Sequence, residues 1–368
     1  MIRHARAIGL LAAFLAIPLV DSASAALLLY EPFNYAEDRF LLATAPGAGP
    51  NSTTSPIGHM APNNNNWYGT GIAAATNYLV ANDGQVTLTD LTVPGLAKPN
   101  STRSLTLGGT GHTMRLSLNS STPATPNSTA VNLTDVADPL AGTDATLQAT
   151  DTAGTGYYSL ALRVTDITGL NATGGILAAF NNTINAQVGN PTTGGAGLAI
   201  RPKAGGGPNE FELGVVDQAT SGFTSATYDT VNAYTTNTTI FVVGKYQTVG
   251  VPGNPTPAEN DDVATLWINP SPATFGGFDP TTGVVLFNNS TNNDIPTNAS
   301  TNNHTLQSFI LRQTGATVNN QVPPGVIFDE LRVGTNYADV TPVVPEPGST
   351  ALALVGAAGI AAVRRRRR

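Results

Sequence analysis

The sequence contains no cysteine in 368 residues. That absence excludes disulfide bonds, a thiol nucleophile and a thiolate metal site. Histidine is scarce, and the three outside the N-terminal segment are far apart, at positions 59, 112 and 304, without the paired spacing of a zinc helix. There is also no Gly-x-Ser-x-Gly nucleophile motif and no phosphate-binding glycine loop. No catalytic residue can be named, so the sequence predicts a protein that is not an enzyme.

Charged residues make up only 11% of the chain, and their signs are unevenly distributed. Between residues 26 and 342 there are ten Lys and Arg against 22 Asp and Glu, so this region has a net charge of about −12, compared with −7 for the whole chain. An acidic body disfavours nucleic acid and anionic lipid as partners. Divalent cations and neutral glycans remain compatible with it.

Residues 26–342 also lack sustained helical periodicity. They are rich in Asn, Thr, Gly and Ser, which favours strands joined by many turns. Apolar and polar residues alternate in Tyr157–Thr165, the pattern of a half-buried strand. Similar patterns occupy 26–30, 85–91, 113–118, 175–180, 197–201, 210–216, 239–246, 262–269, 306–312 and 326–333. Because no crossover helix separates these segments, they predict an all-β fold: a single antiparallel β-sandwich.

The N-terminus predicts export. Arg3 and Arg6 precede an apolar stretch over residues 8–20, and Ala23 and Ala25 provide the small residues of a signal peptidase cleavage site. We therefore assign residues 1–25 to a signal peptide and expect the mature chain to begin at Ala26. The alternative, a first transmembrane helix, is disfavoured because the apolar stretch has only about 13 residues, fewer than the ~20 that span a bilayer.

The C-terminus, residues 343–368, has three parts: Pro345-Glu346-Pro347, an apolar segment over 350–363, and five arginines over 364–368. The apolar segment is shorter than the roughly 20 residues of a self-sufficient span. Cationic flanks stay on the cytoplasmic side of a membrane. The arginines therefore orient the chain with its body on the outside.

This order of parts resembles the PEP-CTERM sorting signal of bacterial exported proteins, through Pro345, Glu346, Pro347, Arg364, Arg365 and Arg366. The resemblance implies membrane anchoring through a C-terminal transmembrane helix and recognition by an exosortase-type transpeptidase. Cleavage near Pro345–Pro347 would then release the protein or transfer it to the cell surface or extracellular matrix. The alternative is an ordinary tail anchor with a basic flank.

Landmarks at the start, middle and end of the body resemble the concanavalin-like jelly-roll domains of lectins, laminin-G modules and glucanases; they are Leu29–Tyr35, Phe241–Tyr246 with Asp262–Pro270, and Ile327–Gly334. The resemblance implies that residues 26–342 form one jelly-roll sandwich. It also implies that the first and last strands lie close together.

Asp329 is the most unusual residue of the last predicted strand. Strict alternation places it on one face with Ile327, Leu331 and Val333, and a carboxylate on an apolar face is costly unless it is paired or bound to metal. The jelly-roll resemblance implies a structural calcium ion, with Glu31 and Asp329 as its carboxylate ligands. The alternatives are a bulge that turns Asp329 outward, or pairing with Arg39 or Arg332.

Two features bear on carbohydrate. A glucanase on this fold needs closely spaced carboxylates on one strand face; Glu210 and Glu212 approach this, but the next acid is Asp217, which departs from the family's Glu-x-Asp followed by another Glu. Trp67 and Tyr68 follow four consecutive asparagines and are predicted either to stack on a glycan or to anchor a loop. Trp267 is expected in the core. We predict a carbohydrate-interacting or structural module that binds extracellular polysaccharide; the alternative is a divergent glycoside hydrolase-like enzyme.

Overall fold

The computed structural model describes residues 27–31, 33, 67–70, 78–82, 91–97, 103–108, 112–117, 148–149, 155–181, 194–219, 226–247, 262–288, 304–306, 308–313 and 325–344. The predicted signal peptide and the chain beyond Val344 lie outside these residues. Among the described residues, no helix is both long enough and apolar enough to cross a membrane.

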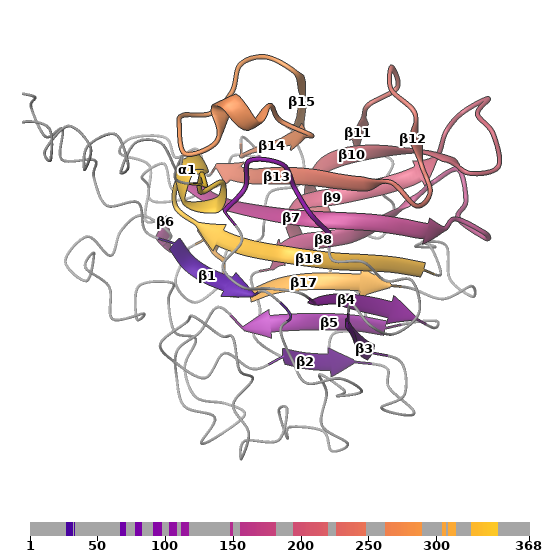
Figure 1. The fold of residues 1–368 in the computed structure, drawn as a ribbon, viewed down its shortest axis with the longest axis horizontal. Coiled ribbons are helices and arrows are strands. Elements are labelled where there is room, and N and C mark those ends of the chain that lie inside the picture. The colour runs from indigo at the N-terminus through magenta and orange to yellow at the C-terminus, as the bar shows by residue number, and fades with distance from the viewer. Residues whose placement is uncertain are drawn as a thin grey trace, which may run out of the picture.

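Two antiparallel sheets of eight strands each form the body (Figure 1). The first sheet has the order β15-β14-β13-β7-β18-β4-β3, and β1 also pairs with β18. Its strands are β1 (Leu27–Glu31), β3 (Tyr78–Asn82), β4 (Arg103–Gly108), β7 (Thr155–Asp166), β13 (Thr239–Gln247), β14 (Val263–Ile268), β15 (Val284–Asn288) and β18 (Gly325–Gly334).

The second sheet has the order β11-β10-β9-β8-β17-β5-β2, with β12 also paired to β10. Its strands are β2 (Trp67–Thr70), β5 (His112–Ser117), β8 (Gly175–Asn181), β9 (Gly194–Pro202), β10 (Glu210–Ala219), β11 (Thr227–Tyr228), β12 (Tyr234–Thr235) and β17 (Ser308–Gln313). Two further short strands, β6 (Gln148–Ala149) and β16 (His304–Thr305), pair with each other.

The strand order confirms the predicted all-β fold. Consecutive strands change sheets at β4–β5, β7–β8 and β17–β18, so the sandwich is a jelly roll and not two sequential meanders. The first and last strands lie close together, as expected, because Tyr30 and Glu31 of β1 pair with Arg332 and Leu331 of β18. The predicted strand over 85–91 falls outside the described residues except for Leu91, which is not in a strand.

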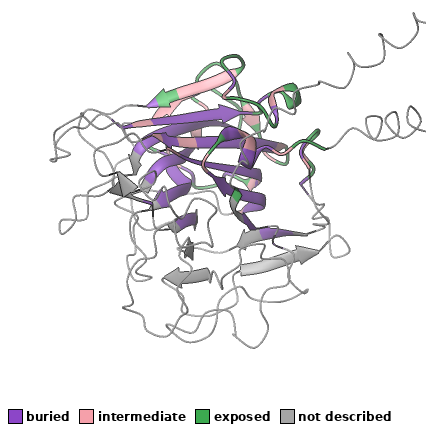
Figure 2. Ribbon diagram, turned by 90° about the vertical axis from the view of Figure 1, so that its left-hand side faces the viewer, coloured by how far each residue is buried: buried purple, intermediate pink, exposed green. Residues whose placement is uncertain are grey.

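The main core lies between the two sheets. The inward residues of β7 are Tyr158, Leu160, Leu162 and Val164, as the alternation predicted. Tyr158 packs against Phe180 and Phe309 of the second sheet, with ring centroids 5.5 and 5.0 Å apart. Figure 2 shows the consequence, with buried strands in the interior and exposed residues concentrated in connections.

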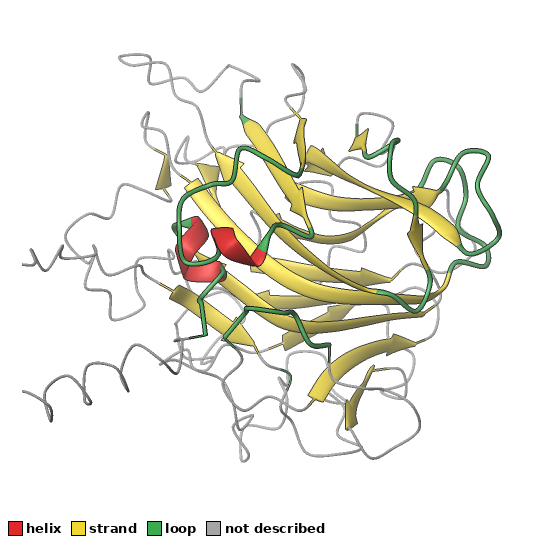
Figure 3. Cartoon of the chain, turned by 45° about the horizontal axis from the view of Figure 1, so that its top comes forward, coloured by secondary structure: helices red, strands yellow, loops and turns green. Residues whose placement is uncertain are grey.

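A second apolar cluster covers the outer face of the first sheet. Segment 91–97, the short 3-10 helix η1 (Pro272–Thr274) and the one-turn helix α1 (Tyr337–Val340) lie over it. Figure 3 shows the two helical segments side by side on this face, and the hydroxyls of Thr274 and Tyr337 are 3.2 Å apart. Trp267 is buried here, as expected, and its indole N–H donates to the Pro280 carbonyl at 2.8 Å. The sequence did not predict α1, because a single turn carries no periodicity.

The prediction that Asp329 shares a face with Leu331 and Val333 is wrong. The β18–β7 register shifts between Asp329 and Arg332, where Glu330 has a φ of 56°. A bulge of this kind inserts one extra residue and reverses the faces that follow it. Leu331 and Val333 therefore join Phe328 in the core between the sheets, whereas Asp329 stays on the opposite face with Ile327, buried beneath segment 91–97.

Candidate functional site

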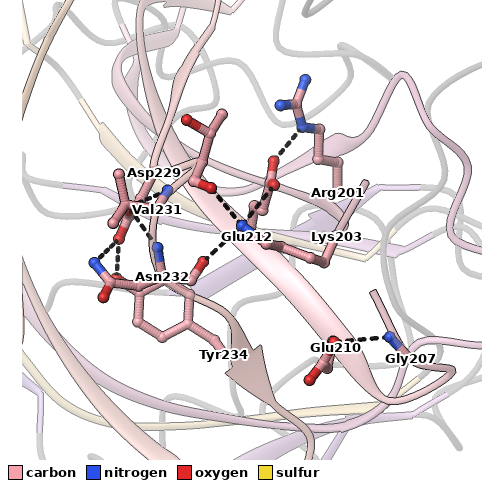
Figure 4. A network of polar contacts seen from close by, with 10 residues as sticks. Arg201, Lys203, Gly207, Glu210, Glu212, Asp229, Val231, Asn232 and Tyr234 are labelled. Carbon is pink, nitrogen blue, oxygen red and sulfur yellow. Dashed lines mark hydrogen bonds and ion pairs between the residues drawn. The ribbon is translucent and has the colours of Figure 1, made fainter. Parts of the chain in front are cut away.

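A network of polar contacts lies on the outer face of the second sheet (Figure 4). Phe211, Leu213 and Val215 of β10 point into the core, so alternation places Glu212 on the outer face. Its carboxylate is buried and receives the Arg201 Nε at 2.7 Å and the Lys203 Nζ at 3.2 Å. Both carboxylate oxygens are thus engaged by cations.

The connection between β11 and β12 closes over this ion-paired group. Lys203 Nζ donates to the carbonyls of Thr230 at 2.5 Å and Asn232 at 3.2 Å. Asp229 accepts hydrogen bonds from the backbone of Val231 and Asn232 and from the Tyr234 hydroxyl. Burial raises the pKa of the Asp229 carboxyl, but these hydrogen bonds outweigh it and hold the pKa below its usual value. Asp229 is therefore ionised at neutral pH and fixes the shape of the loop.

Tyr228 stands beside the same ion pairs. The Arg201 guanidinium lies 4.0 Å from the centre of its ring, a cation–π contact. Burial raises the pKa of Tyr228 to about 12, against the opposing effect of Arg201. Its hydroxyl is buried and has no hydrogen-bond partner among the residues that the structure describes.

This arrangement does not form a pair of carboxylates for acid–base catalysis. A glycosidase needs one carboxylate free to attack or deprotonate and one that donates a proton. Glu212 is held by two cations, and Glu210 Oε2 accepts the N–H of Gly207 at 2.7 Å within its own turn. The network is suited to holding β9, β10 and the β11–β12 connection together as a rigid polar surface.

The two predicted calcium ligands lie on neighbouring strands and are both buried. Glu31 Oε1 accepts the N–H of Phe33 at 2.7 Å, and the Asp329 oxygens accept the N–H groups of Leu91 at 3.2 Å and Glu330 at 2.8 Å. Calcium takes six to eight oxygen ligands. Among the described residues, no group of three acidic or histidine side chains could hold a metal ion. Calcium binding therefore stays a prediction.

The sequence did not identify a buried ion pair beside these residues. Arg332 donates to Glu330 Oε2 at 2.5 Å and to the Ala97 carbonyl at 2.6 Å. The Tyr30 ring lies 4.7 Å from this guanidinium, and its hydroxyl donates to Glu330 Oε1. The signal that could have revealed the pair is the placement of Glu330 and Arg332 two residues apart within an apolar strand. The sequence alone offers Arg332 only as an alternative partner of Asp329.

The predicted glycan-binding residues Trp67 and Tyr68 begin β2, an edge strand of the second sheet, and not a loop. They pair with Leu116 and Arg115 of β5. Their side chains lie outside what the structure describes, as do the cleavage residues Ala23 and Ala25 and the sorting residues of the tail.

The C-terminus matches a known family model. Residues 343–368 match the model described as the PEP-CTERM protein-sorting motif. The chain ends in a PEP-CTERM sorting motif. The motif implies that the protein is exported, is anchored at its C-terminus before processing, and is processed by an exosortase. No curated protein sequence matches the chain.

The chain is similar to several solved structures at low identity. Domain 4 of AbnA, a GH43 extracellular arabinanase from Geobacillus stearothermophilus in complex with arabinotriose, is 13% identical with a TM-score of 0.33, over 86% of this chain and 98% of that one. Alginate lyase vAL-1 from Chlorella virus is 8% identical with a TM-score of 0.31, over 65% and 88%. The HCR/D W1238A mutant is 10% identical with a TM-score of 0.30, over 72% of this chain. The chain spans 47%, about half, of the length of that protein. Similarity this low carries no argument about function.

Proposed function

We propose that this protein is a non-catalytic component of the cell surface or extracellular matrix whose sandwich body interacts with carbohydrate, such as exopolysaccharide, or has a structural role there. The observation that carries the proposal is the sorting motif at residues 343–368, joined directly to the jelly-roll body. The engagement of Glu210 and Glu212 in hydrogen bonds and ion pairs supports the absence of catalysis.

The proposed carbohydrate contact is at Trp67 and Tyr68. Both lie in β2, the edge strand of the second sheet, where a bound polymer could run alongside it. Aromatic rings provide flat apolar surfaces with a polar group at one end, which suits them to partly wet binding sites.

The test is binding of the purified full-length protein to a panel of polysaccharides, including the matrix of the producing organism. We expect saturable binding that Trp67→Ala weakens at least tenfold and that Val231→Ala, a change at an exposed residue of the second sheet, leaves unchanged. Absence of binding to every polysaccharide would leave the structural role alone. Polysaccharide cleavage that disappears in Glu210→Gln or Glu212→Gln would instead establish the glycoside hydrolase-like alternative.

Calcium is proposed as the structural ion at Glu31 and Asp329. An ion that binds only the folded protein stabilises it in proportion to the logarithm of ion concentration over the dissociation constant. The thermal midpoint should therefore rise with added calcium and fall on chelation, and Asp329→Asn should remove this dependence. An unchanged midpoint after chelation would refute the proposal.

A further inference from the structure

The folded body holds the chain up to the start of the sorting motif. Ala97 N–H donates to the Pro342 carbonyl at 2.8 Å, Leu96 and Val343 form an antiparallel bridge, and Val344 N–H donates to the Gly95 carbonyl at 3.3 Å. The family match begins at Val343, so the first two matched residues are attached to the sandwich. Among the described residues, the contacts with the body therefore extend two residues into the motif.

The distance from the body to the apolar tail is therefore short. Five residues, 345–349, lie between Val344 and the apolar segment that begins at Thr350. At no more than ~3.6 Å per residue, the connection spans at most about 20 Å. A folded domain of about 300 residues has a radius of gyration of ~20 Å. While the tail is anchored, the connection keeps the surface around Val344 within about 20 Å of the bilayer.

We define the tail-exit face as residues 91–97, 271–283 and 335–344, which lie over the outer face of the first sheet. These segments contain no lysine or arginine and only two acids, Asp279 and Asp339. Asp279 is paired with Lys245 at 3.0 Å, and Asp339 is buried. The segments of the tail-exit face have a formal charge of −2, but one acid is paired with Lys245 and the other is buried, so neither acid is an exposed, unpaired charge.

Three exposed apolar side chains lie on this face. Phe278 is 96% exposed, and Val343 and Val344 are 49% and 51% exposed. The segment that carries Phe278 contacts the segment that carries the two valines. Gly276 N–H donates to the Thr341 carbonyl at 2.7 Å, and a Cβ on Gly276 would lie 3.3 Å from the Val343 side chain. A nearly fully exposed phenylalanine on a soluble surface has no packing role there, whereas aromatic side chains are favoured at membrane–water interfaces.

We propose that the tail-exit face rests on the membrane surface before processing, with Phe278, Val343 and Val344 in contact with the lipid headgroup layer. This inference depends on anchoring through the sorting motif and not on carbohydrate binding. Because the two sheets are stacked, it also directs the outer face of the second sheet, with Glu212 and its cations, away from the membrane. The anchored protein thus presents one defined surface to its surroundings.

The absence of cysteine allows a direct test. Phe278→Cys and Val231→Cys each introduce the single thiol of the chain, at two highly exposed apolar positions on opposite layers. Each full-length variant is labelled with an environment-sensitive fluorophore and inserted through its tail into phosphatidylcholine vesicles. A fraction of the lipids carries a nitroxide quencher on the headgroup. Vesicles without the nitroxide give the reference intensity for each label.

We expect the label at position 278 to be quenched at least threefold more strongly than the label at position 231. Equal quenching at the two positions would overturn the proposal, as would stronger quenching at 231. The label at 278 could instead be shielded from solvent only in cell membranes that contain the processing enzyme, and not in pure lipid vesicles. That result would also overturn the proposal and would identify the tail-exit face as a contact for a protein. The quenching of the two labels does not depend on polysaccharide binding, so this test is independent of the carbohydrate proposal.

Discussion

At the scale of single residues, two tyrosines differ in one hydrogen bond. The Tyr158 hydroxyl is fully buried and donates to the Ala196 carbonyl at 2.9 Å, whereas the buried Tyr228 hydroxyl has no partner within the described part of the chain. Removing a hydroxyl that makes no hydrogen bond loses no hydrogen-bond energy, whereas removing one that donates leaves its acceptor unpaired. We expect Tyr158→Phe to lower the free energy of unfolding by about 1–2 kcal/mol and Tyr228→Phe to change it by less than ~0.5 kcal/mol. Denaturant titration measures both; equal losses would contradict the assignment.

A glycine beneath Tyr158 provides a second test of the core. A Cβ on Gly244 would lie 2.1 Å from the Tyr158 ring, which is wedged between Phe180 and Phe309 and cannot move aside. Gly244→Ala should therefore lower the free energy of unfolding by about 1–3 kcal/mol or more. Gly207→Ala is the matched control, because the nearest atom to its Cβ would be 3.8 Å away. A neutral Gly244→Ala variant would show that the tyrosine ring has room to shift.

At the scale of elements, the sequence predicted the central strands better than their registers. Alternation identified β7, β10 and β13 because each has one face in the core between the sheets. It missed β3, which carries no alternation, and β4, in which Leu105 and Leu107 alternate with polar residues over only six positions. It also could not place the bulge at Glu330, because a bulge depends on the pairing of β18 with β7 and not on the β18 sequence alone.

The same limit applies to the candidate site. The sequence singled out Glu210 and Glu212 as two acids on one face, but the cations that bind Glu212 lie in β9 and directly after it. Arg201 and Lys203 become neighbours of Glu212 only through the β9–β10 register, which pairs Glu212 with Arg201. The tail was predictable because its motif is contiguous and needs no folded context, and the family match confirms it.

The junction of the first and last strands depends on Arg332. Its guanidinium joins β18 to segment 91–97 through the Ala97 carbonyl and lies over Tyr30 of β1, while it neutralises Glu330. Removing one member of a buried ion pair costs far more than replacing both. Arg332→Met should lower the free energy of unfolding by about 3 kcal/mol or more, and adding Glu330→Gln should recover part of that loss. A double variant less stable than Arg332→Met would contradict this account of the junction.

At the scale of the whole molecule, buried tyrosines set the upper pH limit of stability. Tyr30, Tyr157, Tyr158, Tyr228, Tyr234 and Tyr337 all have a pKa raised above 10, and burial is the largest cause for each. In the unfolded chain these phenols ionise near pH 10. Above that pH the unfolded state binds fewer protons than the folded state, so stability falls as pH rises. Below pH 10 the contribution is fully present.

We therefore expect these phenols to leave the thermal midpoint unchanged up to about pH 10. Between pH 10 and pH 12 the thermal midpoint should fall steeply. Because each buried phenol must ionise on unfolding, tyrosinate absorbance should appear together with the loss of structure and not before it. Tyr228→Phe should make the decline less steep by the contribution of one proton between pH 10 and about 12, the raised pKa of that phenol. The stability of the Tyr228→Phe variant at neutral pH serves as the control, because we expect it to equal that of the unaltered protein. Smooth ionisation of all tyrosines near pH 10 with the fold intact would mean that solvent reaches these phenols, and the sandwich would be more open than the strand packing indicates.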